Sequence, residues 1–390
     1  MSLSSNASQP PIIEGIERPD DDSMLAAVRE IANGPLAALA EDIDRQGVYP
    51  EEIMRSLGEA GAFMAHLSGL PGGANYVTAI NAIAEVSRVC GSTGFLMWCQ
   101  MACTMYLERS ANPDLHDDVL LEVATAEVLG GTGLSNAMKS LANIEKNHLS
   151  ARADGEDFIV DGMLPWVSNL GEDHSFCAVA VVQTPDGPRE LMFYVNCADA
   201  GVSTRRCPEF SALEGTATLG VTFSHHRVRP SRVVAWPARP YIAGIRGAFL
   251  LLQCGIGAGI IQGAIDSMHD VEAQLGHVNS FLDDRPADLQ NELDAILARV
   301  AELAKTPYDN SNEYFARVLA VRGEAAELTL RATQSALLHA GARGYLASSP
   351  VQRRVREGQF VAIVTPAIKH IRSELARLSA SSVSSSGDGI

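Results

Sequence analysis

Apolar residues recur at helical spacing over the first third of the chain. From Met24 onward they fall three or four positions apart, which is the period of a helix with one buried face. The proline and two glutamates at 50–52 predict the start of a further helix, since proline suits the first turn and acidic side chains suit its positive end. Helices are also predicted over 77–88 and 92–109, so this part is expected to be a helical domain.

The pattern changes to short alternating stretches in the middle of the chain. Apolar and polar residues alternate there, and turn-forming sequences separate the stretches; TPDG at 184–187 is one such turn. This part therefore predicts a β-domain. Strands are expected over 148–152, 158–161, 176–182, 191–196 and 218–223.

One stretch of this predicted β-domain, FIVDGMLPWVSN at 158–169, combines aromatic and hydrogen-bonding residues. It begins with the alternation of a strand, and Gly162 predicts a tight turn within it. Taken alone, the stretch is typical of a hairpin whose Trp166 fills the core while Ser168 and Asn169 form a turn.

Helical spacing returns from Tyr241 onward. The longest apolar run, 247–261, is shorter than the ~20 residues that a membrane span needs, and it contains Gln253 and three closely spaced glycines. Small residues at this spacing let a neighbouring helix approach closely. A helix over about 241–268 is therefore predicted to lie buried in a bundle and not in a membrane. Further helices are expected over 286–304, 311–340 and 365–379.

Charge and cysteine content argue against several classes of protein. The 390-residue chain has a formal net charge of −17 and no dense basic stripe, so it is not expected to bind nucleic acid. Its seven cysteines lack CxxC or CxxH spacing, and Cys99 and Cys103, four positions apart in an apolar helical run, are expected to pack in the core. Adjacent His225 and His226 would point to opposite faces of a strand and do not predict a metal site. No signal peptide precedes residue 20, so a cytoplasmic location is expected.

The order of several motifs resembles the acyl-CoA dehydrogenase superfamily. That superfamily carries a strand–Gly–x–Lys–x–Trp–Ile/Val–Ser/Thr–Asn segment, and every element except the lysine is present at 158–169. It also carries Gly-Gly-x-Gly-Tyr and then Pro-x-x-Arg-x-x-Arg-Asp, which HAGARGYLASSPVQRRVRE at 339–357 resembles, with Ala342 for the second glycine. Weaker matches in the family order are Asp44, Pro50, Ala60–Gly61, Gly72–Gly73 and Glu85-Val86-Ser87.

The resemblance implies a mostly α fold with a central β-domain of barrel or sandwich type. The expected parts are an N-terminal helical domain over 21–128, a flavin-contacting β-domain over 129–237 and a C-terminal four-helix bundle over 238–378. Residues 1–20 and 379–390 are expected to form a flexible arm and tail. The resemblance further implies a homodimer or homotetramer.

The resemblance also implies a flavin site without metal. Trp166 is expected to pack near the flavin, and Ser168 is expected to hydrogen-bond its isoalloxazine ring. Two glycines of the 339–357 motif would meet FAD from a neighbouring subunit. The expected cofactor is FAD, with FMN as the alternative. The implied cofactor-binding residues are Thr132, Ser135, Trp166, Ser168, Gly341 and Gly344.

The chain departs from the superfamily at three positions that bear on chemistry. The glutamate that removes the substrate α-proton in the dehydrogenases aligns with Thr365, and its alternative site falls near Ile245 and Arg246. The Arg-x-x-Phe-Gly clamp for the FAD pyrophosphate aligns with 272–276, where Glu272 would repel phosphate. These differences weaken the expectation of ordinary acyl-CoA dehydrogenation and of tight FAD binding.

The same scaffold also serves flavin-dependent monooxygenases, which lack the base glutamate and take reduced flavin from a partner reductase. In that branch Ser168 and His370 are the candidate catalytic residues. The favoured expectation is a monooxygenase-type flavin oxidoreductase acting on a small molecule. The alternatives are an FAD-dependent dehydrogenase of acyl thioesters with an unidentified base, and a flavin-free binding protein.

Overall fold

The structure, a computed structural model, describes residues 18–70 and 72–385 of the chain. The N-terminal helices are α1 (Asp21–Ile31), α2 (Ala37–Gln46), α3 (Glu51–Glu59), α4 (Tyr76–Val89), α5 (Gly91–Arg109), α6 (Pro113–Leu115) and α7 (Leu121–Ala124), with π-helical turns η1 (Ala32–Leu36) and η2 (His116–Leu120). Side chains of Asp20 and Asn75 cap α1 and α4, and Pro50 precedes α3 as the sequence predicts.

Eight strands form the central sheet. They are β1 (Gly130–Thr132), β2 (Leu149–Asp154), β3 (Asp157–Val167), β4 (Ser175–Thr184), β5 (Gly187–Asn196), β6 (Val202–Arg206), β7 (Leu219–Val228) and β8 (Val233–Ala235). Their order is β6-β7-β3-β2-β4-β5-β8, and β1 pairs with β4 in parallel. The hairpin of β4 and β5 closes between Thr184 and Gly187, at the predicted turn. The connections contain α8 (Leu134–Leu141), η3 (Glu214–Thr216) and η4 (Pro230–Arg232).

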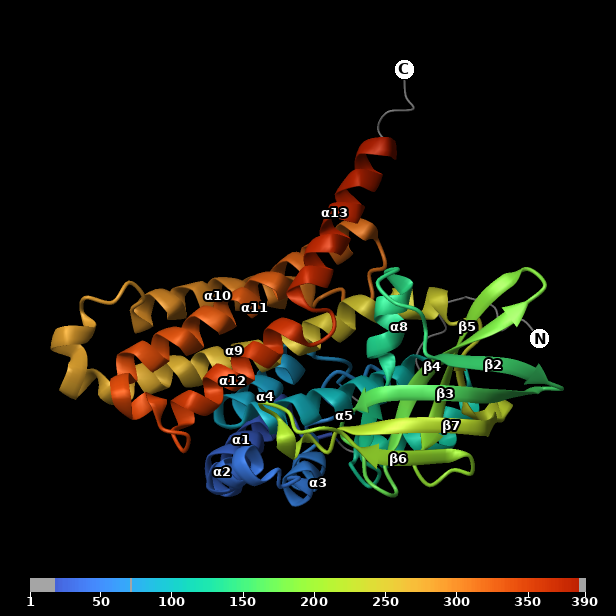
Figure 1. The fold of residues 1–390 in the computed structure, drawn as a ribbon, viewed down its shortest axis with the longest axis horizontal. Helices are drawn as coiled ribbons and strands as arrows, with labels where there is room; N and C mark the ends of the chain where they lie inside the picture. Colours follow the sequence, from blue (N-terminus) through green and yellow to red (C-terminus); the bar gives the residue numbers. More distant parts are fainter. Residues whose placement is uncertain (1–17, 71, 386–390) are drawn as a thin grey trace.

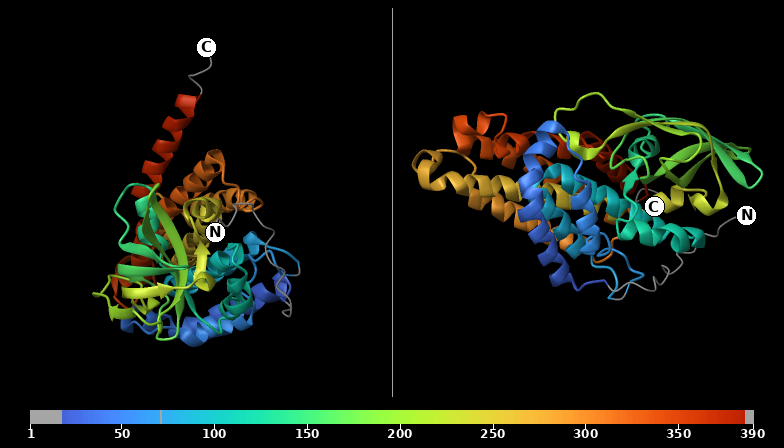
Figure 2. Two further views of the ribbon diagram at one scale, coloured as in Figure 1. Left: turned by 90° about the vertical axis from the view of Figure 1, so that its right-hand side faces the viewer. Right: turned by 90° about the horizontal axis from the view of Figure 1, so that it is seen from below.

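Long helices form the C-terminal part. They are α9 (Arg239–Asn279), α10 (Pro286–Leu303), α11 (Asn312–Ala340), α12 (Pro350–Ile363) and α13 (Ile368–Ser385), with the 3-10 turn η5 (Gly341–Tyr345). The sheet lies beside one end of these helices, and α8 and α13 are neighbours at that junction (Figure 1). The shorter helices α1–α3 lie along the side of the bundle that faces the viewer in the right panel of Figure 2.

The central helix of the bundle, α9, is buried. By length and composition it could cross a membrane, and no other described helix could, but 94% of its most apolar window is buried inside the protein. A Cβ atom on Gly255, Gly259 or Gly263 would collide with main-chain oxygen atoms of α4, so the two helices pack with their backbones in contact. This confirms the prediction of a buried helix that a neighbour approaches at its glycines.

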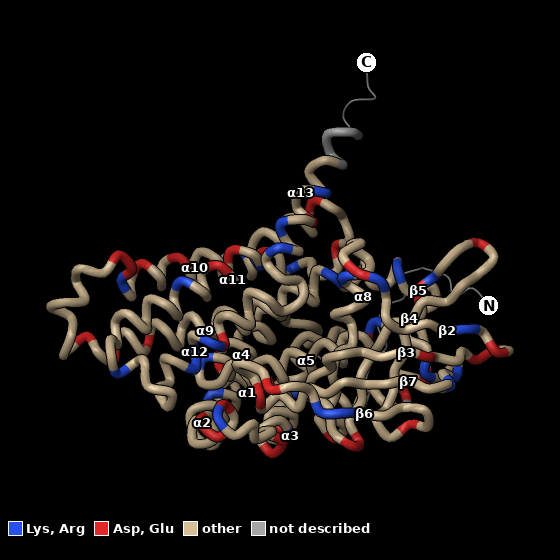
Figure 3. The backbone as a smooth tube through the Cα atoms, in the orientation of Figure 1, with Lys and Arg blue, Asp and Glu red and all other residues tan. Residues whose placement is uncertain are grey.

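The apolar interior consists of two main clusters. Buried residues of the N-terminal helices and of the C-terminal helices merge in one cluster, and the sheet encloses another. The charged residues lie mainly along outer helices and loop ends, whereas α5 crosses the centre almost uncharged (Figure 3). The N-terminal and C-terminal helical parts share one core, so the apolar clusters do not mark a boundary between them. The predicted domain boundaries therefore stay predictions.

Two predicted features of the β-domain differ from the structure. Gly162 does not make a tight turn: β3 continues through it, and the pairing with β7 shifts register there. Ser135, one of the implied cofactor-binding residues, lies in the first turn of α8, a helix that the sequence pattern did not indicate.

The C-terminal part also differs from prediction at two places. Helix α12 was not predicted, although Pro350 at its first turn is a start signal. Helix α13 continues to Ser385, beyond the expected start of a flexible tail at 379, because a helix once formed extends at little cost even through serine. Residues 1–17 and 386–390, which were predicted to be flexible, lie outside the described residues.

A buried histidine makes the N-terminal part sensitive to acid. The Nε2 atom of His66 lies 2.9 Å from the Met101 carbonyl oxygen and 3.0 Å from the Thr104 hydroxyl. Since a carbonyl only accepts, Nε2 carries the proton, and the buried Nδ1 has no hydrogen-bond partner in the described part of the chain. Burial lowers the pKa of His66 to about 4.

We expect His66 to reduce stability as the pH falls. Its unfolded-state pKa is about 6.5 and its folded-state value is lower, so the stability present above pH ~6.5 is lost as the pH falls toward 4. The variant His66→Gln keeps a donor for Met101 and should lose roughly 2 kcal/mol less between pH ~7 and ~4.5. Urea unfolding at several pH values measures this difference.

The control is His269→Gln, which removes an imidazole at an exposed position of α9 and should leave the acid-induced loss of stability in place. An identical pH dependence in His66→Gln and the wild type would contradict the assignment.

Candidate functional site

Trp166, near the end of β3, lies on the outside of the sheet. Between Leu164 and Val167, β3 has one residue more than the facing part of β7, which forms a bulge. The bulge changes the alternation, so that Trp166 faces outward and is 59% exposed. Met163, which precedes the bulge, is 41% exposed. The indole meets the Phe210 ring edge-on at 6.5 Å. The hairpin interpretation with Trp166 in the core is therefore wrong, and a flat apolar surface is accessible here.

Ser168 begins a series of hydroxyl groups beside this surface. Its Oγ lies 2.6 Å from Oγ1 of Thr218, which lies 2.8 Å from Oγ1 of Thr216. The Thr216 hydroxyl donates to the main-chain oxygen of Leu213 at 2.7 Å. A serine oxygen makes up to three hydrogen bonds, so the partly buried Ser168 can still contact a ligand.

Thr132 and Ser135 lie in the segment that passes next to Ser168. A Cβ atom on Gly131 would collide with the main-chain oxygen of Ser168, so β1 passes directly against the end of β3. The Thr132 hydroxyl lies 2.9 Å from the Tyr106 hydroxyl, and Ser135 is exposed. The segments that carry three predicted residues thus lie together: Thr132 in β1, Ser135 in α8 and Ser168 directly after β3.

Thr365 joins this group from the C-terminal part of the chain. Its hydroxyl lies 2.7 Å from that of Ser135. Gln253 of α9 donates to the main-chain oxygen of Thr365 at 3.0 Å and accepts from the buried Arg322 of α11 at 3.1 Å. The segment between α12 and α13 is therefore held from inside the bundle. No local sequence signal could indicate the contact between residues 135 and 365.

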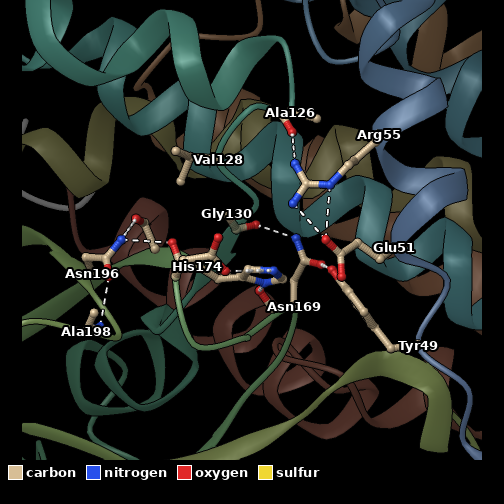
Figure 4. A network of polar contacts seen from close by, with 12 residues as sticks. Tyr49, Glu51, Arg55, Ala126, Val128, Gly130, Asn169, His174, Asn196 and Ala198 are labelled. Carbon is tan, nitrogen blue, oxygen red and sulfur yellow. Dashed lines mark hydrogen bonds and ion pairs between the residues drawn. The ribbon is translucent and has the colours of Figure 1, made fainter.

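The side chain of Asn169 fixes the end of β3 (Figure 4). Its Nδ2 donates to the Gly130 carbonyl at 2.8 Å and to Oε1 of Gln100 at 3.1 Å, and its Oδ1 accepts from the Tyr49 hydroxyl at 2.6 Å. Its φ is +65°, a conformation that asparagine adopts more readily than most residues. Asn169 therefore holds its neighbour Ser168 against β1.

Sequence reasoning did not identify Gln100 as a structural residue of this site. It is fully buried in α5, where its Nε2 donates to the Val123 and Val128 carbonyls. Its Oε1 accepts from the Gly130 main chain at 2.6 Å. The sequence did contain a signal for it: Gln100 stands within the apolar run of α5, and a buried amide side chain needs several hydrogen-bond partners.

His370 lies in the first turn of α13. Its side chain is buried, and its Nδ1 has no hydrogen-bond partner among the described residues. Burial lowers the pKa of His370; the negative charge of Glu374 opposes this shift, and the positive charge of Lys139 on α8 adds to it. The imidazole is therefore neutral at neutral pH and able to accept a proton. Its catalytic role stays a prediction.

Gly341 and Gly344 lie at the other end of α12 from Thr365. The 14 residues of α12 separate them by roughly 21 Å, so the structure does not bring these glycines to the hydroxyl group within one chain. Tyr345 is largely exposed and borders a surface pocket of about 470 Å³. The pocket is lined by Asp44, Arg45, Tyr345, Ala347, Gln352 and Arg356.

Two of the positions that depart from the superfamily pattern contact neighbouring side chains. The Arg246 guanidinium lies 3.8 Å from the centre of the Phe315 ring. Glu272 accepts from Arg285 at 2.9 Å, and this pairing reduces the repulsion of phosphate that the sequence predicts.

In the described residues, no group of three or more His, Cys, Asp or Glu side chains could hold a metal ion.

Comparison with known sequences agrees with this architecture. The acyl-CoA dehydrogenase N-terminal domain matches residues 18–127. A probable acyl-CoA dehydrogenase of Mycobacterium leprae is 25% identical over 379 residues, covering 90% of this chain and 94% of that protein. A short-chain-specific acyl-CoA dehydrogenase of Clostridium acetobutylicum is 22% identical over 359 residues, covering 86% and 91%.

Solved structures share the fold. Butyryl-CoA dehydrogenase from Megasphaera elsdenii superposes with a TM-score of 0.81 at 15% identity, covering 93% of this chain and 98% of that one. Dibenzothiophene monooxygenase from a Paenibacillus species superposes with a TM-score of 0.74 at 17% identity, covering 90% and 95%. At these identities the structural likeness establishes the fold and nothing finer.

The fold and site define a protein in which a hydroxyl-rich surface lies between a central sheet and a helical bundle. The N-terminal domain match and the sequence relatives support membership of the acyl-CoA dehydrogenase superfamily, and the fold agrees with it.

We expect Asn169→Ala to destabilise the protein by about 3 kcal/mol. The change removes three side-chain hydrogen bonds, leaves buried partners unsatisfied and places alanine at a positive φ. Chemical denaturation measures the loss. The control is Asn143→Ala, at an exposed position with φ +57°, which should lose only about 1 kcal/mol through the backbone conformation. Equal losses in the two variants would show that the buried amide contacts contribute nothing.

Proposed function

We propose that the protein is a flavin-dependent oxidoreductase of monooxygenase type that acts on a small molecule. One feature carries this choice: the resemblance places the base glutamate of the dehydrogenases at Thr365, whose hydroxyl pairs with that of Ser135. A threonine hydroxyl does not remove a carbon-bound proton at neutral pH, whereas a glutamate does so when it is suitably placed. The geometry therefore favours chemistry that needs no carboxylate at this position.

The residues present fit a flavin. Its ring system requires a flat apolar contact and hydrogen-bonding groups along an edge, and exposed Trp166 and Met163 supply the first. The hydroxyls of Thr132, Ser135 and Ser168 would supply the second. A bound flavin carries an electron pair between substrates and, when reduced, reacts with oxygen. FAD is the proposed cofactor, and the fold likeness to an FMN-bound dibenzothiophene monooxygenase, with a TM-score of 0.77, supports FMN as the alternative.

His370 would exchange protons in this reaction. Its neutral, buried ring has an Nδ1 atom without a hydrogen-bond partner among the described residues, and it lies on the helix that follows Thr365. A partner reductase would supply reduced flavin, and the chain would act in the cytoplasm as a homodimer or homotetramer.

A second candidate is an FAD-dependent acyl-CoA dehydrogenase. The sequence relatives with this name align over 86–90% of the chain, which supports it. This function needs a base from a position that the superfamily pattern does not indicate. By resemblance, Thr365 and Arg246 occupy the two usual positions of that base.

Two assays distinguish the candidates. A monooxygenase should consume oxygen only when reduced FAD or FMN is supplied, and it should not bleach with acyl-CoA in the absence of oxygen. Bleaching of bound flavin by butyryl-CoA under nitrogen would establish the dehydrogenase and overturn the proposal. Binding of neither oxidised nor reduced flavin would identify a flavin-free protein.

We expect Trp166→Ala and Ser168→Ala each to weaken flavin binding at least about tenfold without unfolding the protein. The first removes the exposed apolar surface, and the second removes a hydrogen-bonding group at the edge of the site. Titration with reduced FAD under nitrogen measures the affinity. The control is Ser203→Ala at an exposed position of β6, which should bind as the wild type does. Unchanged affinity in both site variants would show that flavin does not bind at Trp166 and Ser168.

A further inference from the structure

The series of hydroxyls behind Ser168 has a direction. The Thr216 hydroxyl donates to the Leu213 carbonyl at 2.7 Å, and a carbonyl oxygen can only accept. A hydroxyl carries one hydrogen. Thr216 therefore has none left for Thr218, so in the 2.8 Å contact between them Thr218 donates.

The same reasoning extends to Ser168. Because Thr218 has used its hydrogen on Thr216, the 2.6 Å contact between Ser168 and Thr218 must be donated by Ser168. The Ser168 oxygen consequently offers only lone pairs to a ligand. Thr216 is 2% exposed, so water does not readily replace the carbonyl that sets this direction.

A hydroxyl that only accepts distinguishes the two redox states of a flavin. The central ring of oxidised flavin has a nitrogen, N5, that only accepts hydrogen bonds, and reduction converts it to an N–H donor. An acceptor facing an acceptor leaves both groups unsatisfied, which is unfavourable in a partly buried site. An acceptor facing the N–H of reduced flavin forms a hydrogen bond.

We propose that Thr216 and Thr218 are positioning residues that orient the Ser168 hydroxyl as an acceptor and thereby make the site select reduced flavin. This inference rests on the proposed function, since it needs a bound flavin whose N5 atom faces the Ser168 hydroxyl. It explains how a chain of this superfamily could take reduced flavin from a separate donor and release the oxidised form. Ser168 is the residue that would contact the flavin. The direction of its hydrogen bond is set by Thr216, two side chains away.

The test compares affinities for oxidised and reduced FAD, with FMN in parallel, by titration calorimetry under nitrogen. Wild-type protein should bind the reduced form at least about tenfold more tightly. Thr216→Val keeps the shape of the side chain but frees Thr218 to donate to Ser168, which can then donate to oxidised flavin. Its preference for reduced flavin should fall about tenfold, equivalent to about 30 mV for a two-electron couple.

Two further variants separate orientation from packing. Thr216→Ser restores the hydroxyl and should restore the preference for reduced flavin. Thr329→Val removes a fully buried threonine hydroxyl that donates to the Ala325 carbonyl within α11, so it controls for the loss of such a group and should keep the wild-type preference. In Thr216→Val the Leu213 carbonyl still accepts from the Thr216 main-chain N–H, which favours retention of the fold.

The outcomes are distinct for the two proposals. If wild-type protein binds flavin but shows no preference, or if Thr216→Val keeps the preference, the orientation of Ser168 does not select the redox state and this inference is overturned. If Thr216→Ser fails to restore a preference lost in Thr216→Val, the effect comes from packing and the inference is likewise overturned. If wild-type protein binds neither form, the proposed function itself fails.

Discussion

The candidate site depends on a buried pair of amide side chains, Gln100 and Asn169. Together they satisfy main-chain groups of Gly130 and of the segment before it, and so join α5, β1 and the end of β3. Buried amides are costly unless every donor and acceptor is satisfied, so this arrangement permits little displacement. Ser168, the neighbour of Asn169, is positioned by this pair of side chains.

The opposite side of the site depends on the bundle. Close packing of α4 against the glycines of α9 fixes the central helix, and Gln253 on that helix holds the main chain of Thr365. The fully buried Arg322 orients Gln253, because a guanidinium only donates and must face the amide oxygen. The Ser135–Thr365 contact thus joins the β-domain side of the site to the bundle side.

The groups at this meeting point are uncharged at neutral pH. The resemblance places the base glutamate of the dehydrogenases at Thr365, which is a hydroxyl in this chain, and the neutral imidazole of His370 lies in the first turn of the following helix. On the β-domain side, the hydroxyl series behind Ser168 ends on a carbonyl and so has a defined direction. Uncharged groups of defined hydrogen-bond direction distinguish a donor from an acceptor on a ligand, but they do not supply a strong base.

The sequence by itself determined the order of helical and β parts, the buried central helix and the segments that carry Thr132, Ser135, Trp166 and Ser168, because these depend on local periodicity and short motifs. It did not determine that Trp166 faces outward, since that follows from a bulge in the pairing of β3 with β7. Nor could it bring Ser135 to Thr365 or set the direction of the Ser168 hydroxyl. Those features depend on contacts between residues far apart in the chain, and only the packed tertiary structure decides which distant groups share a hydrogen bond.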